Sequence, residues 1–294
     1  MENIGVRIRD IQLFIARVCK CRRGHAGSRV AEYMEVLILR DATPAGDATL
    51  PPTYRVSCAE CTVSRLCFPF VLNSTDVVHL NRLATQLPPL QEGELLIRAG
   101  DPASSIYVVR SGSVKSFGIS EDGEEQIMAF HFPGEIVGLD SVNQAQYENF
   151  ATALETTSVC NLPFRELENL ARNIPELQDQ LFRMMSQELL QEQELIMLLN
   201  KKNTAARVAT FLLNLSARFS KRRLSPLVFN LPMPRSDIAN YLGMASETVS
   251  RIMSRLRGSQ IIEFQRSELH ILDFEALNSL AGTKCKLESM ARSG

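Results

Sequence analysis

Short apolar runs separated by glycines characterise residues 90–162. The clearest runs are Leu95–Ile97, Ile106–Arg110, Ser113–Ile119 and Gln126–Phe132. The pair Asp122-Gly123, between the last two runs, is a strong signal for a β-hairpin turn. Strands at this spacing, joined by tight turns, are typical of a small β-roll or barrel. The pattern therefore predicts an all-β domain.

The pattern becomes helical after Pro175, and neither glycine nor proline interrupts it until well past Asn203. Apolar residues recur here at spacings of three and four, and a glutamate fills the one gap between them. The predicted seam consists of Leu181, Met185, Leu189, Glu192, Ile196 and Leu199. A helix of roughly 25 residues with such a seam is more often a dimerisation helix than a buried core helix. Glu192 would then face its own copy across a two-fold axis, where two like charges oppose dimer formation.

Two helices joined by a tight turn are predicted within residues 235–260. The first runs from about Ser236 to Leu242 and ends at Gly243, and the second begins near Ala245–Ser246. The inner side of the second helix would carry Val249, Ile252, Met253 and Leu256. Two helices joined by a short turn that contains glycine are characteristic of a helix-turn-helix. Residues 261–272 predict a two-stranded hairpin, which makes this a winged helix-turn-helix.

Glu247, Ser250 and Arg251 share one face near the start of the second helix, because residues three and four apart are neighbours. In a recognition helix this end enters the major groove of DNA. Arginine can donate two hydrogen bonds to guanine, glutamate can accept one from cytosine, and serine can contact either type of base. The alternative is an ordinary surface Glu–Arg pair, but the helix-turn-helix context favours base reading. Ser246 and Arg235 complete the predicted DNA contacts.

Composition adds a basic region and a cytoplasmic location to this interpretation. The 294 residues are 45% hydrophobic and 22% charged, as in soluble globular proteins of about two domains. The net charge is −1, yet twelve Lys and Arg against three Asp and Glu lie from Lys201 to Arg266, which suits binding to phosphates. No apolar run reaches the roughly 18 residues of a membrane span, and the apolar residues 11–19, interrupted by Arg17, lack the features of a secretory signal. We expect a cytoplasmic protein that does not bind a membrane.

Three of the seven cysteines, Cys58, Cys61 and Cys67, form a C-x2-C-x5-C run directly before the predicted β-domain. An odd number of cysteines in a cytosolic chain argues against a disulfide framework and towards metal or redox chemistry. Three thiolates on a short loop need a fourth ligand to hold a [4Fe–4S] cluster. Cys160, in the strand-like residues 157–162, is the candidate for that ligand.

The spacing alone leaves the chemistry of these cysteines open. A lone buried cysteine is usually a small hydrophobic residue, so the interpretation of Cys160 depends on the triplet upstream. Four thiolates also suit a tetrahedral zinc ion, although structural zinc sites more often use paired C-x2-C knuckles. A thiol–disulfide switch in the same cysteines is a further alternative. An electron-transfer protein or an enzyme is not expected, because neither a nucleophile–base pair nor a glycine-rich phosphate loop is evident and the helix-turn-helix would have no role.

A cysteine triplet, a β-roll, a long helix and a winged helix-turn-helix, in this order, resemble the FNR branch of the CRP/FNR family of transcription regulators over residues 58–282. Four stretches are close to how members of that branch read: Arg110-Ser-Gly-Ser-Val-Lys-Ser116, Ala153-Leu-Glu-Thr-Thr-Ser-Val-Cys160, Leu198-Leu-Asn-Lys-Lys-Asn203 and Asn240-Tyr-Leu-Gly243. The resemblance implies an α+β chain. Its expected parts are a poorly ordered extension at 1–57, a cysteine loop and cyclic-nucleotide-binding-like β-roll sensor domain at 58–168, a dimerisation helix at 169–203, a C-terminal winged helix-turn-helix domain at 204–282 and a tail at 283–294.

The resemblance also implies a function for each group of residues. Cys58, Cys61, Cys67 and Cys160 correspond to the ligands of a [4Fe–4S] cluster. Glu247, Ser250 and Arg251 correspond to residues that read the TTGAT half-sites of a palindrome. Glu192 lies where the family has an aspartate that keeps the cluster-free form monomeric. The implied protein is an oxygen sensor and anaerobic activator that acts as a homodimer, with double-stranded DNA and RNA polymerase as its other partners.

At two places the chain lacks a residue that is common in related regulators. Cyclic-nucleotide-binding relatives hold the phosphate with an arginine late in the β-roll, but the corresponding stretch here, Glu148-Asn149-Phe150-Ala151, has none. We therefore expect no cyclic nucleotide as a ligand. Ala245 stands where a serine or threonine N-cap is common, which costs about 1 kcal/mol of helix stability unless Ser246 caps the helix instead.

Overall fold

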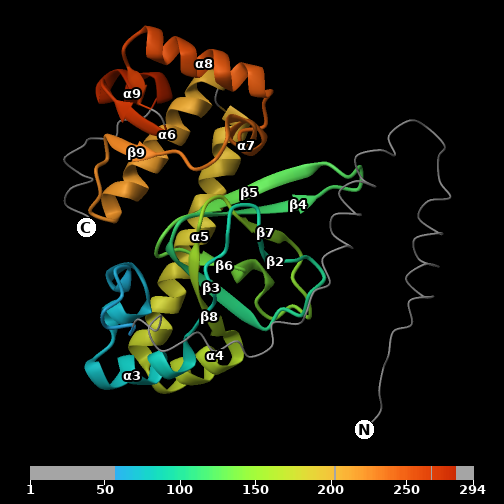
Figure 1. Cartoon of the computed structure of the whole chain (residues 1–294), viewed down its shortest axis with the longest axis vertical. Helices are drawn as coiled ribbons and strands as arrows, with labels where there is room; N and C mark the ends of the chain where they lie inside the picture. The colour runs from blue at the N-terminus through green and yellow to red at the C-terminus, as the bar shows by residue number, and fades with distance from the viewer. Residues whose placement is uncertain (1–56, 202, 266, 283–294) are drawn as a thin grey trace, which may run out of the picture. The chain divides into compact units, whose positions relative to one another are not determined.

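The computed structural model describes residues 57–201, 203–265 and 267–282 (Figure 1). All of these residues belong to one compact unit. The predicted N-terminal extension, apart from Ser57, and the predicted tail at 283–294 lie outside the described residues. Of the helices that can be described, none is both long enough and apolar enough to cross a lipid bilayer.

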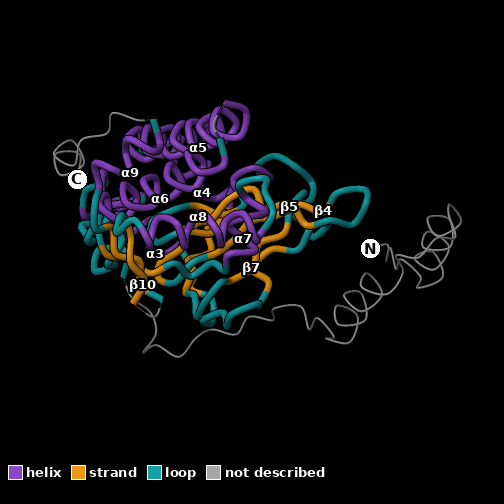
Figure 2. Tube along the Cα trace, turned by 90° about the horizontal axis from the view of Figure 1, so that it is seen from above, coloured by secondary structure: helices purple, strands orange, loops and turns teal. Residues whose placement is uncertain are grey.

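The β-domain consists of two antiparallel four-stranded sheets, with the strand orders β1-β8-β3-β6 and β2-β7-β4-β5. The strands are β1 Thr85–Gln86, β2 Leu95–Ile97, β3 Ser105–Ser111, β4 Val114–Ile119, β5 Glu125–His131, β6 Ile136–Val137, β7 Phe150–Ala153 and β8 Ser158–Pro163. β4, β5 and β7 lie side by side in both views (Figure 1 and Figure 2). The all-β prediction is confirmed, and its four named runs match observed strands to within one residue at each end.

The β4–β5 hairpin turns at Asp122-Gly123, as the sequence predicts. Gly123 has a φ of 82°, which glycine adopts at little cost because it lacks a Cβ. In β3, the branched side chains of Ile106, Val108 and Val109 are all at most 1% exposed. Branched residues favour strands because they pack well on a pleated surface. The local sequence therefore accounts for both the turn and the core strand.

The helices next to the β-domain are α3 Ser74–Leu83, α4 Phe164–Asn173 and α5 Pro175–Lys201. The predicted dimerisation helix at 169–203 begins too early, because it includes the end of α4. The chain breaks at Ile174, which is extended (φ −129°, ψ 93°), since the residue before a proline is forced out of the α region. Pro175 then occupies the first position of α5, where its missing N–H costs nothing. At 27 residues, α5 is close to its expected length.

The C-terminal domain is a winged helix-turn-helix, as predicted. It consists of α6 Thr204–Lys221, β9 Val228–Asn230, α7 Arg235–Tyr241, α8 Ser246–Gly258, β10 Ile262–Gln265, β11 Glu268–Ile271 and α9 Phe274–Ala281. The predicted hairpin is β10–β11, and β9 adds a third strand next to β11 that the sequence did not predict. Buried residues of this domain, such as Leu212 and Met253, share one hydrophobic core with Phe130 and Phe132 of the β-domain.

Two arginines at the C-terminal end of α6, Arg218 within the helix and Arg222 at its C-cap, bind a single carboxylate of the β-domain. Arg218 and Arg222 both form ion pairs with Glu135, and Arg222 Nη2 lies 2.6 Å from Glu135 Oε1. Both guanidinium groups also lie over the ring of Phe132, at 4.6 and 5.7 Å from its centroid. Arg222 Nε donates a further hydrogen bond of 2.7 Å to the carbonyl of Pro133. The three charged side chains are only 8–18% exposed, so each depends on the others for stabilisation.

Glu135→Gln is expected to lower the free energy of unfolding by about 3–5 kcal/mol near neutral pH, because it leaves two buried arginines without their counter-charge. Burial opposes the charge on Glu135, but Arg218 and Arg222 outweigh it and lower its pKa from 4.5 to about 2. A carboxyl with a lowered pKa stabilises the fold above its ordinary pKa, and this contribution is lost as the pH falls from 4.5 towards 2. The measurement is urea unfolding of both proteins across this pH range.

Glu168→Gln is the matched control, because Glu168 forms an exposed pair with Arg172 on α4. Exposed pairs of this kind are worth less than about 1 kcal/mol, so the control should unfold almost as the parent does. Equal unfolding midpoints for Glu135→Gln and the parent would show that the arginine pair does not depend on Glu135.

Candidate functional site

The three cysteines of the triplet lie on a short loop between residue 57 and α3. The loop contains two turns of 3-10 helix, η2 Ser64–Leu66 and η3 Phe68–Val71, and Cys67 lies between them. The backbone N–H of Cys58 donates a 2.9 Å hydrogen bond to Asn81 Oδ1 on α3. Phe68 is fully buried, so a hydrophobic anchor and a hydrogen bond to α3 both hold the loop against the body of the domain.

The structure brings the four predicted cysteines together. Cys58, Cys61 and Cys67 of the loop and Cys160 of β8 line one small cavity of about 20 Å³. Cys160 reaches it because β8 pairs with β3, where Cys160 lies opposite Val108. Residues almost 100 positions apart in the sequence thus contribute to one thiol-lined space.

Burial favours the protonated thiol form of three of these cysteines. It raises the pKa of Cys58, of Cys67 and of Cys160, the last to about 12. The neighbouring thiols raise all three further, while Arg110 lowers the pKa of Cys58 and of Cys160. Any metal bound here must therefore displace protons and compensate several negative charges. Arg110 is the one nearby cation identified by these interactions, and sequence reasoning quoted it in a motif without assigning it a role.

The arrangement of the cysteines bears on the type of metal group. Within the described parts of the chain, no three His, Cys, Asp or Glu side chains are placed to hold one metal ion together. Four thiolates around one zinc at about 2.3 Å would have to lie roughly 3.8 Å apart. The corners of a four-iron cluster also bind one thiolate each. Four thiols on one cavity are therefore a donor set that fits a four-iron cluster as well as a zinc ion.

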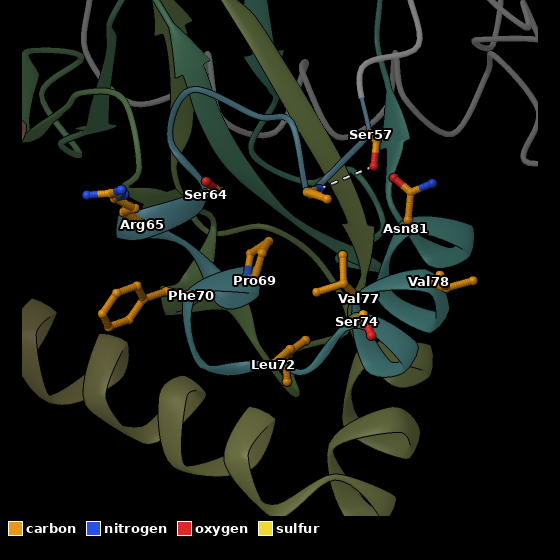
Figure 3. Close-up of a pocket in the computed structure, with 11 residues that line it drawn as sticks. Ser57, Ser64, Arg65, Pro69, Phe70, Leu72, Ser74, Val77, Val78 and Asn81 are labelled. Carbon is orange, nitrogen blue, oxygen red and sulfur yellow. Dashed lines mark hydrogen bonds between the residues drawn. The ribbon is translucent and has the colours of Figure 1, made fainter.

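A second, larger cavity of about 340 Å³ lies between the cysteine loop and α3 (Figure 3). In Figure 3, Pro69 of the loop and Val77 of α3 both lie along it. Phe70 and Val78 line it as well and are 65% and 49% exposed. None of the four cysteines lines this cavity, so it is distinct from the thiol-lined site.

The helix-turn-helix has the geometry that the sequence predicts. Gly243, in the turn, has a φ of 60°, in the left-handed region that favours glycine. On α8, the predicted inner residues Val249, Ile252, Met253 and Leu256 are at most 5% exposed. Ala245 is the N-cap of α8 and supplies no side-chain hydrogen bond, and Ser246 is already the first helical residue. The recognition helix thus begins without a side-chain cap.

The predicted base-reading residues lie on the outer side of α8. Glu247 and Arg251 are exposed, whereas Ser250 and Ser246 are half-buried. Arg235, at the start of α7, is exposed, and its guanidinium lies 5.6 Å from the ring centroid of Phe264 in β10. The wing therefore orients this arginine, a contact that the sequence pattern did not indicate.

The β4–β5 hairpin contacts the first helix of the helix-turn-helix. Asn240 on α7 donates to the carbonyl of Glu125 at 2.6 Å and accepts from the N–H of Ile127 at 2.7 Å. Lys115 forms ion pairs with both Glu125 and Asp237, at 2.7 and 3.0 Å. Sequence reasoning missed these contacts, although Lys115 and Asn240 belong to two of the stretches that carry the family resemblance.

The exposed apolar face of α5 differs in part from the predicted seam. Leu181 is only 7% exposed and packs into the core of the β-domain, so its inclusion in the seam was wrong. Met185 is half-buried against that same core, and Leu199 is half-buried against the core of the helix-turn-helix domain. The large apolar residues exposed on α5 are Phe182, Leu189, Leu190, Ile196 and Met197, at 55–59%. Phe182, Leu189 and Ile196 follow one another at seven-residue intervals and form the exposed α5 stripe. Glu192 is exposed beside this stripe, one turn from Leu189 and from Ile196.

Two family models match the chain. Residues 206–280 match the Crp-like helix-turn-helix domain, and residues 88–173 match the Cyclic nucleotide-binding domain. These ranges correspond to the C-terminal domain and to the β-domain with α4.

The chain aligns with curated relatives over almost the whole length of those relatives. The chain is 44% identical to the Fumarate and nitrate reduction regulatory protein of Vibrio cholerae over 227 residues, which cover 77% of this chain and 91% of that protein. It is 46% identical to the Transcriptional activator protein anr of Pseudomonas aeruginosa over 225 residues, covering 76% and 92%. Among solved structures, FixK2 of Bradyrhizobium japonicum matches with a TM-score of 0.61 and 32% identity, covering 69% of this chain and 98% of that one.

Proposed function

Since this chain belongs to the FNR branch of the CRP/FNR family of transcription regulators, we propose that it senses oxygen through a [4Fe–4S] cluster held by Cys58, Cys61, Cys67 and Cys160. The chain is a DNA-binding regulator and not an enzyme. The observation that carries the proposal is the gathering of four thiols around one cavity. Relatives named for fumarate and nitrate reduction or for anaerobic regulation support a response to the absence of oxygen.

When bound, such a cluster supplies an oxygen-labile group at the junction of the cysteine loop and β8. The chain's own residues connect this junction to α5. Cys58, Cys67 and Cys160 pack against a core that includes Phe68, Leu177 and Leu181. Because Leu177 and Leu181 belong to α5, a change in the loop that moves Phe68 also changes the support beneath this helix. The coupling between sensor and dimer helix is therefore direct packing.

The exposed α5 stripe is the proposed dimer contact, with the two copies of Glu192 beside it. Three large apolar side chains at seven-residue intervals are what a helix presents to its partner in a coiled coil. Glu192 opposes association in the cluster-free form, and binding of the cluster shifts the equilibrium to the dimer. Such a shift requires that the bound group favours the dimer over the monomer.

The dimer presents two α8 helices to a palindrome with TTGAT-type half-sites. Arg251 and Glu247 project from α8 and suit guanine and cytosine respectively, and Ser250 adds a contact to either base type. The exposed arginines of α8, Arg251, Arg255 and Arg257, add positive charge that favours the phosphate backbone. We include RNA polymerase as a partner because three of the relatives are named transcriptional activators.

We propose no cyclic nucleotide as the ligand, although the β-domain matches a cyclic-nucleotide-binding model. In the stretch where a phosphate-binding arginine is expected, Asn149 donates to Asp140 Oδ2 at 2.7 Å. Phe150 stacks on Phe117 with 5.3 Å between ring centroids. A phosphate here would meet the carboxylates of Asp140 and Glu148 instead of a cation, which disfavours its binding.

To test the proposal, the protein is purified without oxygen and the same sample is then exposed to air. We expect about four irons per chain, a broad visible absorption near 400 nm that bleaches in air, and a parallel loss of the dimer and of binding to a TTGAT palindrome. Arg251→Met is the matched control, because it should keep the iron and the dimer but lose the palindrome. A colourless protein with one zinc per chain would overturn the oxygen-sensing proposal and leave the DNA-binding function intact.

A further inference from the structure

Arg207, in the first turn of α6, bonds to two other helices at once. Its Nη2 donates a 2.6 Å hydrogen bond to the carbonyl of Leu199, near the end of α5. Its Nη1 donates a 3.1 Å hydrogen bond to the carbonyl of Leu242, the C-cap of α7. One guanidinium therefore joins the dimerisation helix to the helix-turn-helix.

Both accepting carbonyls lie where a helix has unused acceptors. The last four carbonyls of an α-helix have no amide partner within the helix, and α5 ends at Lys201 and α7 at Tyr241. The negative end of each helix dipole also favours a cation at this place. Arg207 thus acts as a shared C-terminal cap for α5 and α7, and the planar fork of arginine suits two acceptors better than the single ammonium of lysine does.

The position of Arg207 within its own helix indicates that this contact matters. A cation in the first turn of α6 meets the positive end of that helix's dipole, which is locally unfavourable. The two charge-assisted hydrogen bonds more than compensate for this. The local sequence of α6 does not favour an arginine at this position. The interactions that favour it come from the carbonyls at the ends of α5 and α7.

The turn of the helix-turn-helix also packs directly against the end of α5. A Cβ added to Gly243 would lie 3.7 Å from Leu199 Cδ2 and 3.9 Å from Arg207 Nη1. Leu242, the residue before this glycine, is fully buried, and Leu198 on α5 is 7% exposed. Hydrophobic packing and the shared cap together connect α7 and α8 to the end of α5.

We propose that Arg207 is a positioning residue that fixes the orientation of α7 and α8 relative to the dimerisation helix and so sets the half-site spacing that the dimer accepts. This inference rests on the proposed function, because it requires a DNA-binding dimer joined through α5. The recognition helices of such a dimer must lie about 34 Å apart, one turn of DNA. A small rotation at the junction of α5 and α6 changes that separation, and Arg207 opposes the rotation.

The test uses the full-length, anaerobically purified protein and its Arg207→Met and Arg207→Lys variants. Each is titrated with one half-site and with palindromes whose central spacer is lengthened or shortened by one or two base pairs. We expect the parent to bind the palindrome with its best spacing at least about tenfold more tightly than palindromes with other spacings. Arg207→Met should bind that best palindrome about tenfold more weakly than the parent does, because two charged hydrogen bonds are lost. In Arg207→Met the penalty for altered spacing should shrink to about twofold, while single half-site affinity and dimer dissociation stay unchanged.

Arg207→Lys keeps the charge without the fork, so its spacing profile should lie between the other two. If the methionine variant is unstable, the spacing profile of Arg207→Lys is used to test the inference. Arg172→Met, at an exposed position on α4, is the control and should match the parent throughout. If Arg207→Met and the parent show the same spacing profile, the inference about Arg207 is overturned, whereas the proposed function is not affected. Failure of the parent to bind any palindrome would overturn the proposed function and this inference with it.

Discussion

Cys67→Ala is expected to remove the iron from the anaerobic protein, from about four atoms per chain to almost none. Cys67 lies between the two 3-10 turns of the loop and shares its cavity with the three other cysteines. Without it, one corner of a cluster would face a methyl group instead of a thiolate. Loss of a supporting residue around a metal typically costs 10–100-fold in affinity, and loss of a ligand should cost at least as much.

Binding of the variant to a TTGAT palindrome should fall at least about 100-fold under anaerobic conditions, because the proposed dimer depends on the cluster. Iron analysis, the visible spectrum and DNA titration check this on one preparation. Cys285→Ala, outside the proposed ligand set, should keep both iron and DNA binding. The apo forms of the parent and of Cys67→Ala should unfold alike. Retention of full iron content by Cys67→Ala would remove Cys67 from the ligand set.

Glu192→Ala is expected to dimerise and to bind DNA in air. Glu192 is exposed beside the exposed α5 stripe, so two copies would approach each other as the apolar side chains of two subunits meet. Glu188, one turn away and less exposed, is a second carboxyl whose charged form is disfavoured. Burial first, and then the charges of Glu135 and Glu192 among others, raise its pKa to about 7. Removal of the Glu192 charge lessens this repulsion at the proposed contact.

We expect the dissociation constant of the cluster-free Glu192→Ala dimer to fall at least about tenfold, equivalent to about 1.4 kcal/mol. Analytical ultracentrifugation of air-exposed protein measures it, and DNA titration in air checks the consequence. Glu194→Ala is the control, because this exposed glutamate lies on the opposite side of α5 from Ile196. A Glu192→Ala variant that stays monomeric and does not bind DNA in air would show that repulsion at this position does not limit the dimer.

Much of the fold could be predicted because its determinants are local. Asp122-Gly123 specifies a hairpin turn, and branched apolar residues specify β3. Pro175 both ends one helical segment and begins another, although the sequence analysis used it only as a beginning. Gly243 and the apolar residues of α8 determine the helix-turn-helix. In each case the turn chemistry or the periodicity acts within a few residues, so the pattern can be read without the tertiary structure.

The sequence by itself thus determined the main strands of the β-domain, the wing hairpin, the long helix, the helix-turn-helix and the choice of four cysteines. Only the tertiary structure decided which side chains of α5 face inwards. Neighbouring helical positions differ by about 100°, so an apolar repeat alone could not separate buried Leu181 from exposed Phe182. The roles of Arg110, Arg207 and Glu135 also came from the tertiary structure, because these partners lie on other elements, from 8 to 87 residues away, and leave no local pattern. Hydrophobic periodicity specifies that an element forms, whereas long-range packing specifies what it contacts.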